Sequence, residues 1–188
     1  KDILLYHQNE EMQQLLSQAG WDGSVNTDWK DDYLMVVNSN IAGQKTDKVM
    51  TQDIIKDTTI HENGAVTTTL TIRRTHTGTK GAEFTGVRNV NFMRVMVPEG
   101  SELLSATGFT YPDEHLFKVV DGTDTLPALA AIDATTKIHD ATGTRITKEQ
   151  GKTVFGNWTM TDPGQTSVVK ITYQLPLHIL PKKEGNSL

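Results

Sequence analysis

The chain has 188 residues, no cysteine, and 23 acidic against 18 basic residues, which gives a formal net charge of -5. The absence of cysteine excludes disulfides, zinc thiolate sites, iron–sulfur clusters and thiol nucleophiles. The acidic balance argues against a surface for nucleic acid or anionic membranes. No apolar run approaches the ~18 residues of a membrane span, so we expect no span in this sequence. The length admits one large domain or two small ones.

The first 30 residues predict a short strand over residues 3–7 and then one amphipathic helix. Asn9 suits the N-cap of that helix, acidic residues occupy its first turn, and Gly20 suits the position after its C-cap. An apolar stripe at helical spacing should pack against another surface; it consists of Met12, Leu15, Leu16 and Ala19. Trp21 follows the helix directly and is expected to be a core aromatic packed on that stripe.

From about residue 32 onward, strand-forming segments alternate with turn signals. A continuous apolar run over residues 32–37 predicts a strand buried on both faces. The Asn63-Gly64 pair between stretches 48–60 and 65–76 indicates a β-hairpin. Further strands are expected over residues 89–97, 101–109, 115–120, 132–138, 152–160 and 166–175.

Alternation within these segments assigns side chains to faces. In the stretch 65–76, one face should be core, with Val66, Thr68, Leu70 and Ile72. In the last strand the inward set is Val169, Ile171, Tyr173 and Leu175. Trp158 shares a face with Val154 and is therefore expected in the core. Residues 82–91 and 121–145 are expected to form long surface loops, because their patterning is interrupted.

Many short strands, with no helical pattern after residue 20, predict a mainly β fold: an immunoglobulin-like antiparallel β-sandwich with one N-terminal helix. The expected organisation has three parts. Residues 1–30 form a strand, helix and loop that belong to or link to an upstream domain, residues 31–176 form the sandwich, and residues 177–188 form a polar tail.

Four stretches, which span nearly the whole chain in order, carry a resemblance to a known family. They are KDILLYHQNEEMQQLLSQAGWDG, DYLMVVNSNIAGQKTDKVM, NVNFMRVMVPEGSELLSATG and GKTVFGNWTMTDPGQTSVVKITYQLP. Together they resemble the bacterial family named domain of unknown function 4012. The resemblance implies the C-terminal part of a membrane-anchored, largely extracellular protein, anchored through an upstream segment. It implies no particular activity.

The best candidate binding site is the NSNIAGQKTD segment, because polar side chains there follow a strand directly. Its candidate ligand-binding residues are Asn38, Asn40, Lys45 and Asp47. The structural alternative is that the amides bond to the backbone and that Lys45 pairs with Asp47. Trp29 and Tyr111 lie in polar surroundings and are the aromatic residues most suited to stacking on a sugar.

Catalytic and metal motifs do not emerge from the sequence. The histidines lack zinc-ligand spacing, and no G-x-S-x-G or S-x-x-K motif is present. We therefore predict no catalytic residue, no metal site and no cofactor.

Three hypotheses for function follow. The first is a non-catalytic extracellular module of a cell-envelope protein that works by adhesion, assembly or scaffolding, with a cell-wall glycan or another envelope protein as partner. The second is a module that binds envelope polysaccharide, which predicts exposed aromatic rings beside polar side chains. The third is an accessory part of an envelope enzyme whose active site lies in an upstream domain.

Overall fold

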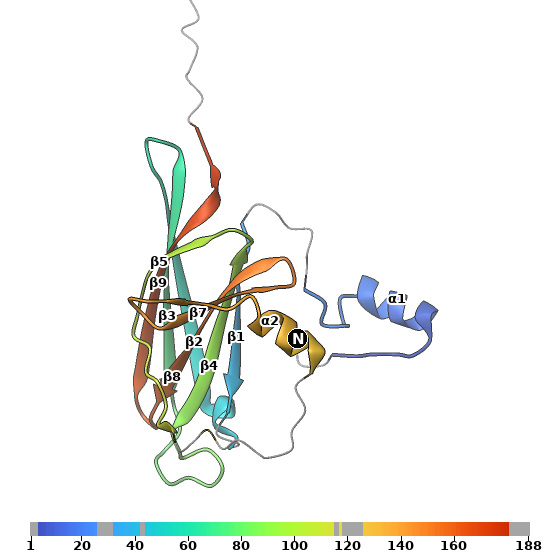
Figure 1. The fold of residues 1–188 in the computed structure, drawn as a ribbon. Helices are drawn as coiled ribbons and strands as arrows, with labels where there is room; N and C mark the ends of the chain where they lie inside the picture. The colour runs from blue at the N-terminus through green and yellow to red at the C-terminus, as the bar shows by residue number, and fades with distance from the viewer. Residues whose placement is uncertain (1–3, 26–31, 42–43, 115–116, 118–125, 181–188) are drawn as a thin grey trace, which may run out of the picture.

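The chain folds into two antiparallel β-sheets packed face to face, as a computed structural model shows (Figure 1). The structure describes residues 4–25, 32–41, 44–114, 117 and 126–180. The helical elements are α1 (Glu10–Gln18), the 3-10 helix η1 (Thr46–Val49) and α2 (Pro127–Asp133). The strands are β1 (Met35–Asn40), β2 (Met50–Ile60), β3 (Ala65–His76), β4 (Asn89–Pro98), β5 (Glu102–Thr107), β6 (Lys137–His139), β7 (Thr144–Glu149), β8 (Lys152–Thr161) and β9 (Thr166–His178).

The two sheets enclose one hydrophobic core. The five-stranded sheet has the order β1-β4-β8-β7-β6 and the four-stranded sheet has the order β2-β3-β9-β5. Alternate residues of the central strands fill the space between the sheets, as the period of a strand requires. The predicted β-sandwich is thereby confirmed as a mainly β, two-sheet architecture. Within the described residues, no helix is both long and apolar enough to cross a membrane.

The core-facing sets predicted for β3 and β9 are confirmed. Val66, Thr68, Leu70 and Ile72 of β3 are at most 1% exposed, and the four predicted side chains of β9 are at most 3% exposed. Ile72, Leu70 and Thr68 pair with Val169, Ile171 and Tyr173. Tyr173 is fully buried in this set, and burial raises the pKa of its hydroxyl to about 12. The raised pKa keeps this hydroxyl protonated to a more alkaline pH than the hydroxyl of an exposed tyrosine.

The hairpin between β2 and β3 is also confirmed. Gly64 has φ +86°, a conformation that costs glycine little, and its N–H donates to the carbonyl of His61 over 2.8 Å. The side chain of Asn63 accepts a hydrogen bond from the N–H of Ala65 over 3.0 Å. Local turn chemistry thus explains why this connection could be predicted.

The prediction for the first sandwich strand was wrong in position and burial. β1 begins at Met35 and includes Asn38 and Asn40, so these amides lie within the strand and do not follow it. Among the described strands β1 pairs with β4 alone, and all its residues are half-buried. It is an edge strand, and an apolar run of strand length cannot distinguish an edge position from a central one.

The segment 121–145, predicted as a loop, contains regular structure where it is described. Helix α2 begins with Pro127, which suits the first turn of a helix, and strands β6 and β7 follow it. The expected strand over residues 132–138 is replaced by the end of α2 and the start of β6. The predicted loop over residues 82–91 also ends early, because β4 starts at Asn89. Of the expected strand 115–120, only Phe117 is described, and it is not in a strand.

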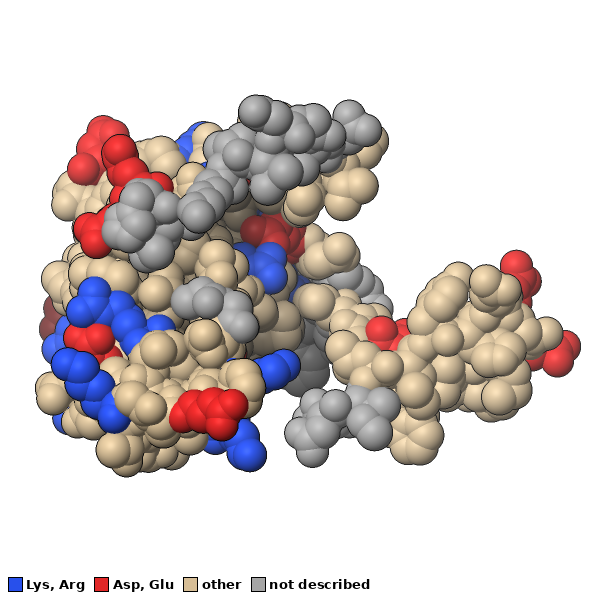
Figure 2. Space-filling model, turned by 90° about the horizontal axis from the view of Figure 1, so that it is seen from below, with Lys and Arg blue, Asp and Glu red and all other residues tan. Residues whose placement is uncertain are grey.

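The N-terminal helix was predicted correctly, but its surroundings were not. The side chain of Asn9 caps α1 by accepting from the N–H of Met12 over 3.1 Å, and Gly20 adopts φ +64° after the helix. Residues 4–7 are not in a strand. No residue of α1 is buried, and Trp21 is 50% exposed and not a core aromatic. Figures 1 and 2 show α1 and the residues beside it apart from the sandwich. In the view from below, this region shows acidic but no basic side chains (Figure 2).

Candidate ligand-binding cleft

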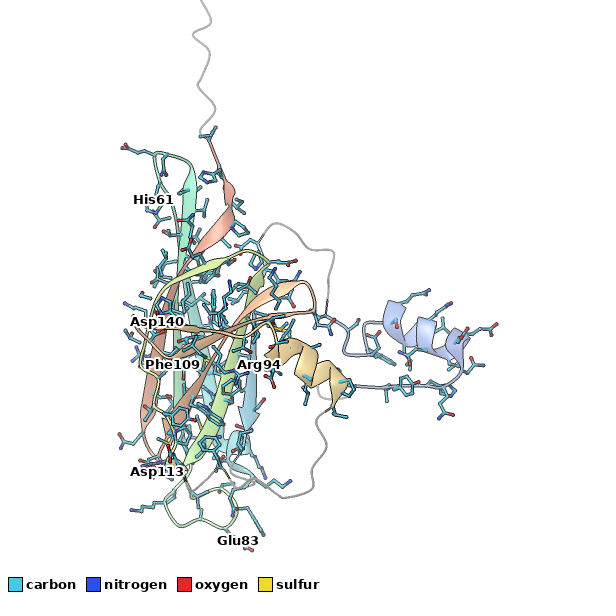
Figure 3. All side chains as sticks on the ribbon, in the orientation of Figure 1. His61, Glu83, Arg94, Phe109, Asp113 and Asp140 are labelled. Atoms are coloured by element: carbon cyan, nitrogen blue, oxygen red, sulfur yellow. The ribbon has the colours of Figure 1, made fainter. Side chains whose placement is uncertain are left out.

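A cleft of about 1010 Å³ lies on the outer face of the five-stranded sheet, beside α2. Its floor comes from strands β4, β8 and β7, which pair so that Arg94, Gly156 and Arg145 stand in one row across the sheet. Figure 3 labels Arg94 at the middle of this sheet, next to α2. The lining residues are Ser39, Ile41, Phe92, Arg94, Tyr111, Phe117, Leu129, Ile132, Asp133, Ile138, Gly143, Arg145, Thr147, Glu149, Val154, Gly156, Asn157 and Trp158.

Four aromatic rings gather at one end of the cleft. Trp158 is the centre of this aromatic cluster, with ring centroids 5.0 Å from Phe92, 5.1 Å from Phe117 and 6.4 Å from Tyr111. Tyr111 and Phe117 are inclined to each other by only 34°, whereas both stand nearly perpendicular to Trp158, at 78° and 74°. The rings therefore form a corner, with Trp158 as one wall and the other two as the second.

A backbone hydrogen bond brings the second wall to the first. The N–H of Thr110 donates to the carbonyl of Trp158 over 2.9 Å, which holds the segment after β5 against β8. Tyr111 follows directly and is 66% exposed. An aromatic ring with this exposure offers a face to a ligand while its neighbours keep it in place.

Two ion pairs supply the polar groups of the cleft. Arg94 donates to Glu149 over 2.8 Å, and the hydroxyl of Thr147 donates to the second oxygen of that carboxylate, also over 2.8 Å. Arg145 donates to Asp133 over 2.7 Å. The Glu149 side chain is only 11% exposed, whereas that of Asp133 is 62% exposed. The first pair is therefore a fixed part of the wall, and the second lies at the rim.

Trp158 was predicted to lie in the core, and this was wrong. It does share a face with Val154, as predicted, but that face is the outer one, away from the four-stranded sheet. Val154 is nevertheless buried, at 1% exposed, although it lines the cleft. Alternation along a strand assigns partners to a face but does not say which face meets the other sheet.

The predicted NSNIAGQKTD site forms part of a polar hydrogen-bond network at one end of the sandwich. Asn38 donates to Gln52 over 2.9 Å and accepts from Asn91 over 3.0 Å. Asn40 donates to Thr46 over 2.9 Å. Both amides lie on the face of β1 opposite to Ser39, which lines the cleft. Asn40 also donates to the backbone carbonyl of Gln44 over 3.1 Å, which is the kind of contact that the structural alternative predicts, whereas Asn38 bonds to side chains.

Asp47 belongs to the same network, but Lys45 does not join it through an ion pair. Asp47 accepts from Asn89 over 3.0 Å and pairs with Arg74 at 3.4 Å. No Lys45–Asp47 ion pair is present among the described residues, and the exposed Lys45 donates its backbone N–H to Phe84 over 2.8 Å. Arg74 is 3% exposed, and burial lowers its pKa although the nearby Asp47 opposes that shift.

Of the two aromatic candidates, Tyr111 lies in the cleft, and Trp29 lies outside the described residues. Phe92, Phe117, Arg94, Arg145 and Glu149 were not predicted as site residues. A signal for part of the cleft exists in β4, where Phe92 and Arg94 occupy one face of a strand whose other face carries Met93, Val95 and Val97. An arginine among apolar residues at that period indicates a face that is not the sandwich core.

In the described part of the chain, no group of three or more His, Asp or Glu side chains is placed to hold a metal ion. Comparison with models of known families, with curated proteins and with solved structures found no significant match.

Proposed function

We propose that this chain is a non-catalytic, carbohydrate-binding module of a bacterial cell-envelope protein and that it holds a saccharide in the cleft beside α2. The observation that carries the proposal is the convergence of four aromatic rings with two arginine–carboxylate pairs in one cavity. Ligand sites are typically concave and mostly apolar, with a few polar groups that fix orientation.

Sugars suit this combination because a pyranose ring has a C–H face that packs on aromatic rings and a rim of hydroxyls. The corner formed by Trp158 and Tyr111 offers two ring faces to such a ligand. Guanidinium N–H groups donate to hydroxyl oxygens, and carboxylate oxygens accept hydroxyl protons. Arg94, Arg145 and Asp133 place both kinds of group within the same cavity.

The resemblance to domain of unknown function 4012 supports the cellular setting of the proposal. We propose an extracellular location, an immunoglobulin-like relationship between the two sheets, and a membrane-anchored parent protein. In that setting a cell-wall or envelope glycan is the natural ligand, and adhesion or assembly at the envelope is the natural role. Antiparallel sandwiches commonly serve as rigid supports for binding residues on their loops and faces.

The test is a glycan array with the purified chain, followed by titration of any hit. Replacing Trp21 and Trp29 by Phe leaves Trp158 as the sole tryptophan, so its emission reports on the cleft. Tyr111→Ala should then weaken binding by at least about fivefold, because an aromatic anchor is lost. Tyr6→Ala is the matched control, since Tyr6 is also exposed (81%) but lies outside the cleft.

An equal loss of affinity in the two tyrosine variants would refute the proposal of carbohydrate binding. An array without a hit at several salt concentrations would refute it as well. The first hypothesis, a scaffolding module that contacts another envelope protein, would then become the leading one.

A further inference from the structure

We infer that the cleft selects an uncharged saccharide unit and disfavours acidic sugars; this inference rests on the proposed function. It concerns the charges that line the cavity. Among its described lining residues, two are cationic, Arg94 and Arg145, and two are anionic, Asp133 and Glu149. Because each cation is paired with a carboxylate, the formal charge of the cleft is balanced before any ligand enters.

Arg94 is held in its ion pair with Glu149. Glu149 is largely buried and holds both oxygens in hydrogen bonds, one to Arg94 and one to Thr147. A ligand carboxylate that took over Arg94 would leave Glu149 buried without its counter-charge, which is costly in a protein interior. The remaining N–H groups of Arg94 can still donate to a hydroxyl, because that contact does not displace Glu149.

Arg145 is less strongly held by its carboxylate partner than Arg94 is, so its ion pair opposes an anionic ligand less. Its pair with Asp133 is at the rim, where both side chains are more than 40% exposed, at 43% and 62%. Arg145 also donates to the hydroxyl of Thr136 over 3.2 Å. A ligand carboxylate near Arg145 would meet the like charge of Asp133, so the rim pair also favours a neutral ligand.

The aromatic corner adds to this selection. Tyr111, Phe117 and Trp158 present apolar ring faces, and an uncharged pyranose can pack in the corner against them without losing the hydration of a charge. Because the two walls of the corner are perpendicular, one sugar ring can contact both of them. We therefore expect the cleft to take a single neutral sugar unit of a glycan, by its C–H face.

The experiment compares two matched ligands, a neutral hexose oligosaccharide and the corresponding uronic-acid oligosaccharide, which differ only in the carboxylate at the sixth carbon. The pair is chosen from the family of sugars that the array identifies. We expect the neutral ligand to bind at least about tenfold more tightly, equivalent to ~1.4 kcal/mol. Its affinity should be unchanged between low and high salt, because an uncharged ligand is not screened.

A second variant examines the cause of the preference. Asp133→Asn removes the rim carboxylate from an exposed position, so it should leave the fold intact. It should raise the affinity for the uronic-acid ligand by about tenfold relative to the affinity for the neutral ligand, since Arg145 is freed for a charge-assisted bond. If the acidic ligand binds the unaltered chain as well as the neutral one, or if Asp133→Asn leaves the ratio of the two affinities unchanged, the inference is overturned while the proposed function stands. If neither ligand nor any array glycan binds, the proposed function itself fails.

Discussion

The ring of Phe92 lies across Gly156 on the neighbouring strand: a Cβ atom added to Gly156 would sit 2.9 Å from Cζ of Phe92. Gly156 is in β8, opposite Arg94 of β4 and Arg145 of β7. Glycine in a strand interior weakens the strand, and it often marks a close approach of another group. Here the missing side chain makes room for the aromatic ring that forms part of the cleft floor.

Gly156→Ala should therefore disturb the cleft more than the fold. The contact involves the far end of a side chain, so Phe92 can move aside, and we expect a loss of ~1 kcal/mol in the free energy of unfolding. The free energy of ligand binding should be weakened by more than the free energy of unfolding, because the aromatic corner is rearranged. Urea unfolding and ligand titration measure the two effects.

The control for this substitution is a double-mutant cycle with Phe92→Leu. Without the ring, an alanine at position 156 meets no obstacle. Gly156→Ala should therefore cost less stability in the Phe92→Leu background than in the unaltered chain. Additive effects on stability would show that the Phe92 ring is not what Gly156 accommodates.

Asn89 connects the polar network at the end of the sandwich, and its removal should destabilise the protein. Its amide donates to Thr46 and Asp47 and accepts from the buried Arg74 over 3.0 Å. Asn89→Leu leaves the buried Thr46 and Arg74 without this partner, so we expect a loss of about 2–4 kcal/mol. Chemical denaturation measures it. Lys45→Ala should change stability by less than ~0.5 kcal/mol, since that side chain is exposed. Comparable losses in the two variants would contradict a special role for Asn89.

The buried hydroxyl of Tyr173 predicts a loss of stability in strong alkali. Its pKa is raised to about 12 in the folded protein, against ~10 for an unfolded chain. The folded state therefore holds the proton longer, and stability falls as pH rises from 10 toward 12. Thermal unfolding of the chain and of Tyr173→Phe across this range isolates the effect from the titration of lysines. The difference in melting temperature between the two should widen above pH 10 in favour of Tyr173→Phe; a constant difference would count against the shift.

Asn9→Ala should loosen α1 without weakening the sandwich. The cap contributes ~1 kcal/mol to a helix, yet α1 buries none of its residues, so its stability is local. Hydrogen exchange should speed up for amides of residues 10–18 and stay unchanged in β3 and β9. A matching increase in those strands would show that α1 is coupled to the core.

Several features of this protein were determined by residues close together in the sequence. The cap at Asn9, the turn at Asn63-Gly64 and the alternation of Val169, Ile171 and Tyr173 each depend on contacts within a few residues. Those contacts form in the same way wherever the segment lies in the fold, so they could be predicted. The prediction of a mainly β fold rests on such local patterns.

Only the tertiary structure decided that the face of β8 that carries Trp158 lines a cleft and is not part of the core. Trp158 and Val154 share a face in any register, but pairing with Phe92 and contact with Tyr111 and Phe117 turned that face into an aromatic corner. Likewise, strand pairing and sheet packing placed Asn38 in hydrogen-bond contact with Gln52 and Asn91, which made it part of a structural network. The physical reason is that burial and long-range pairing depend on the whole arrangement of the sheets, whereas capping, turns and alternation depend on the local chain alone.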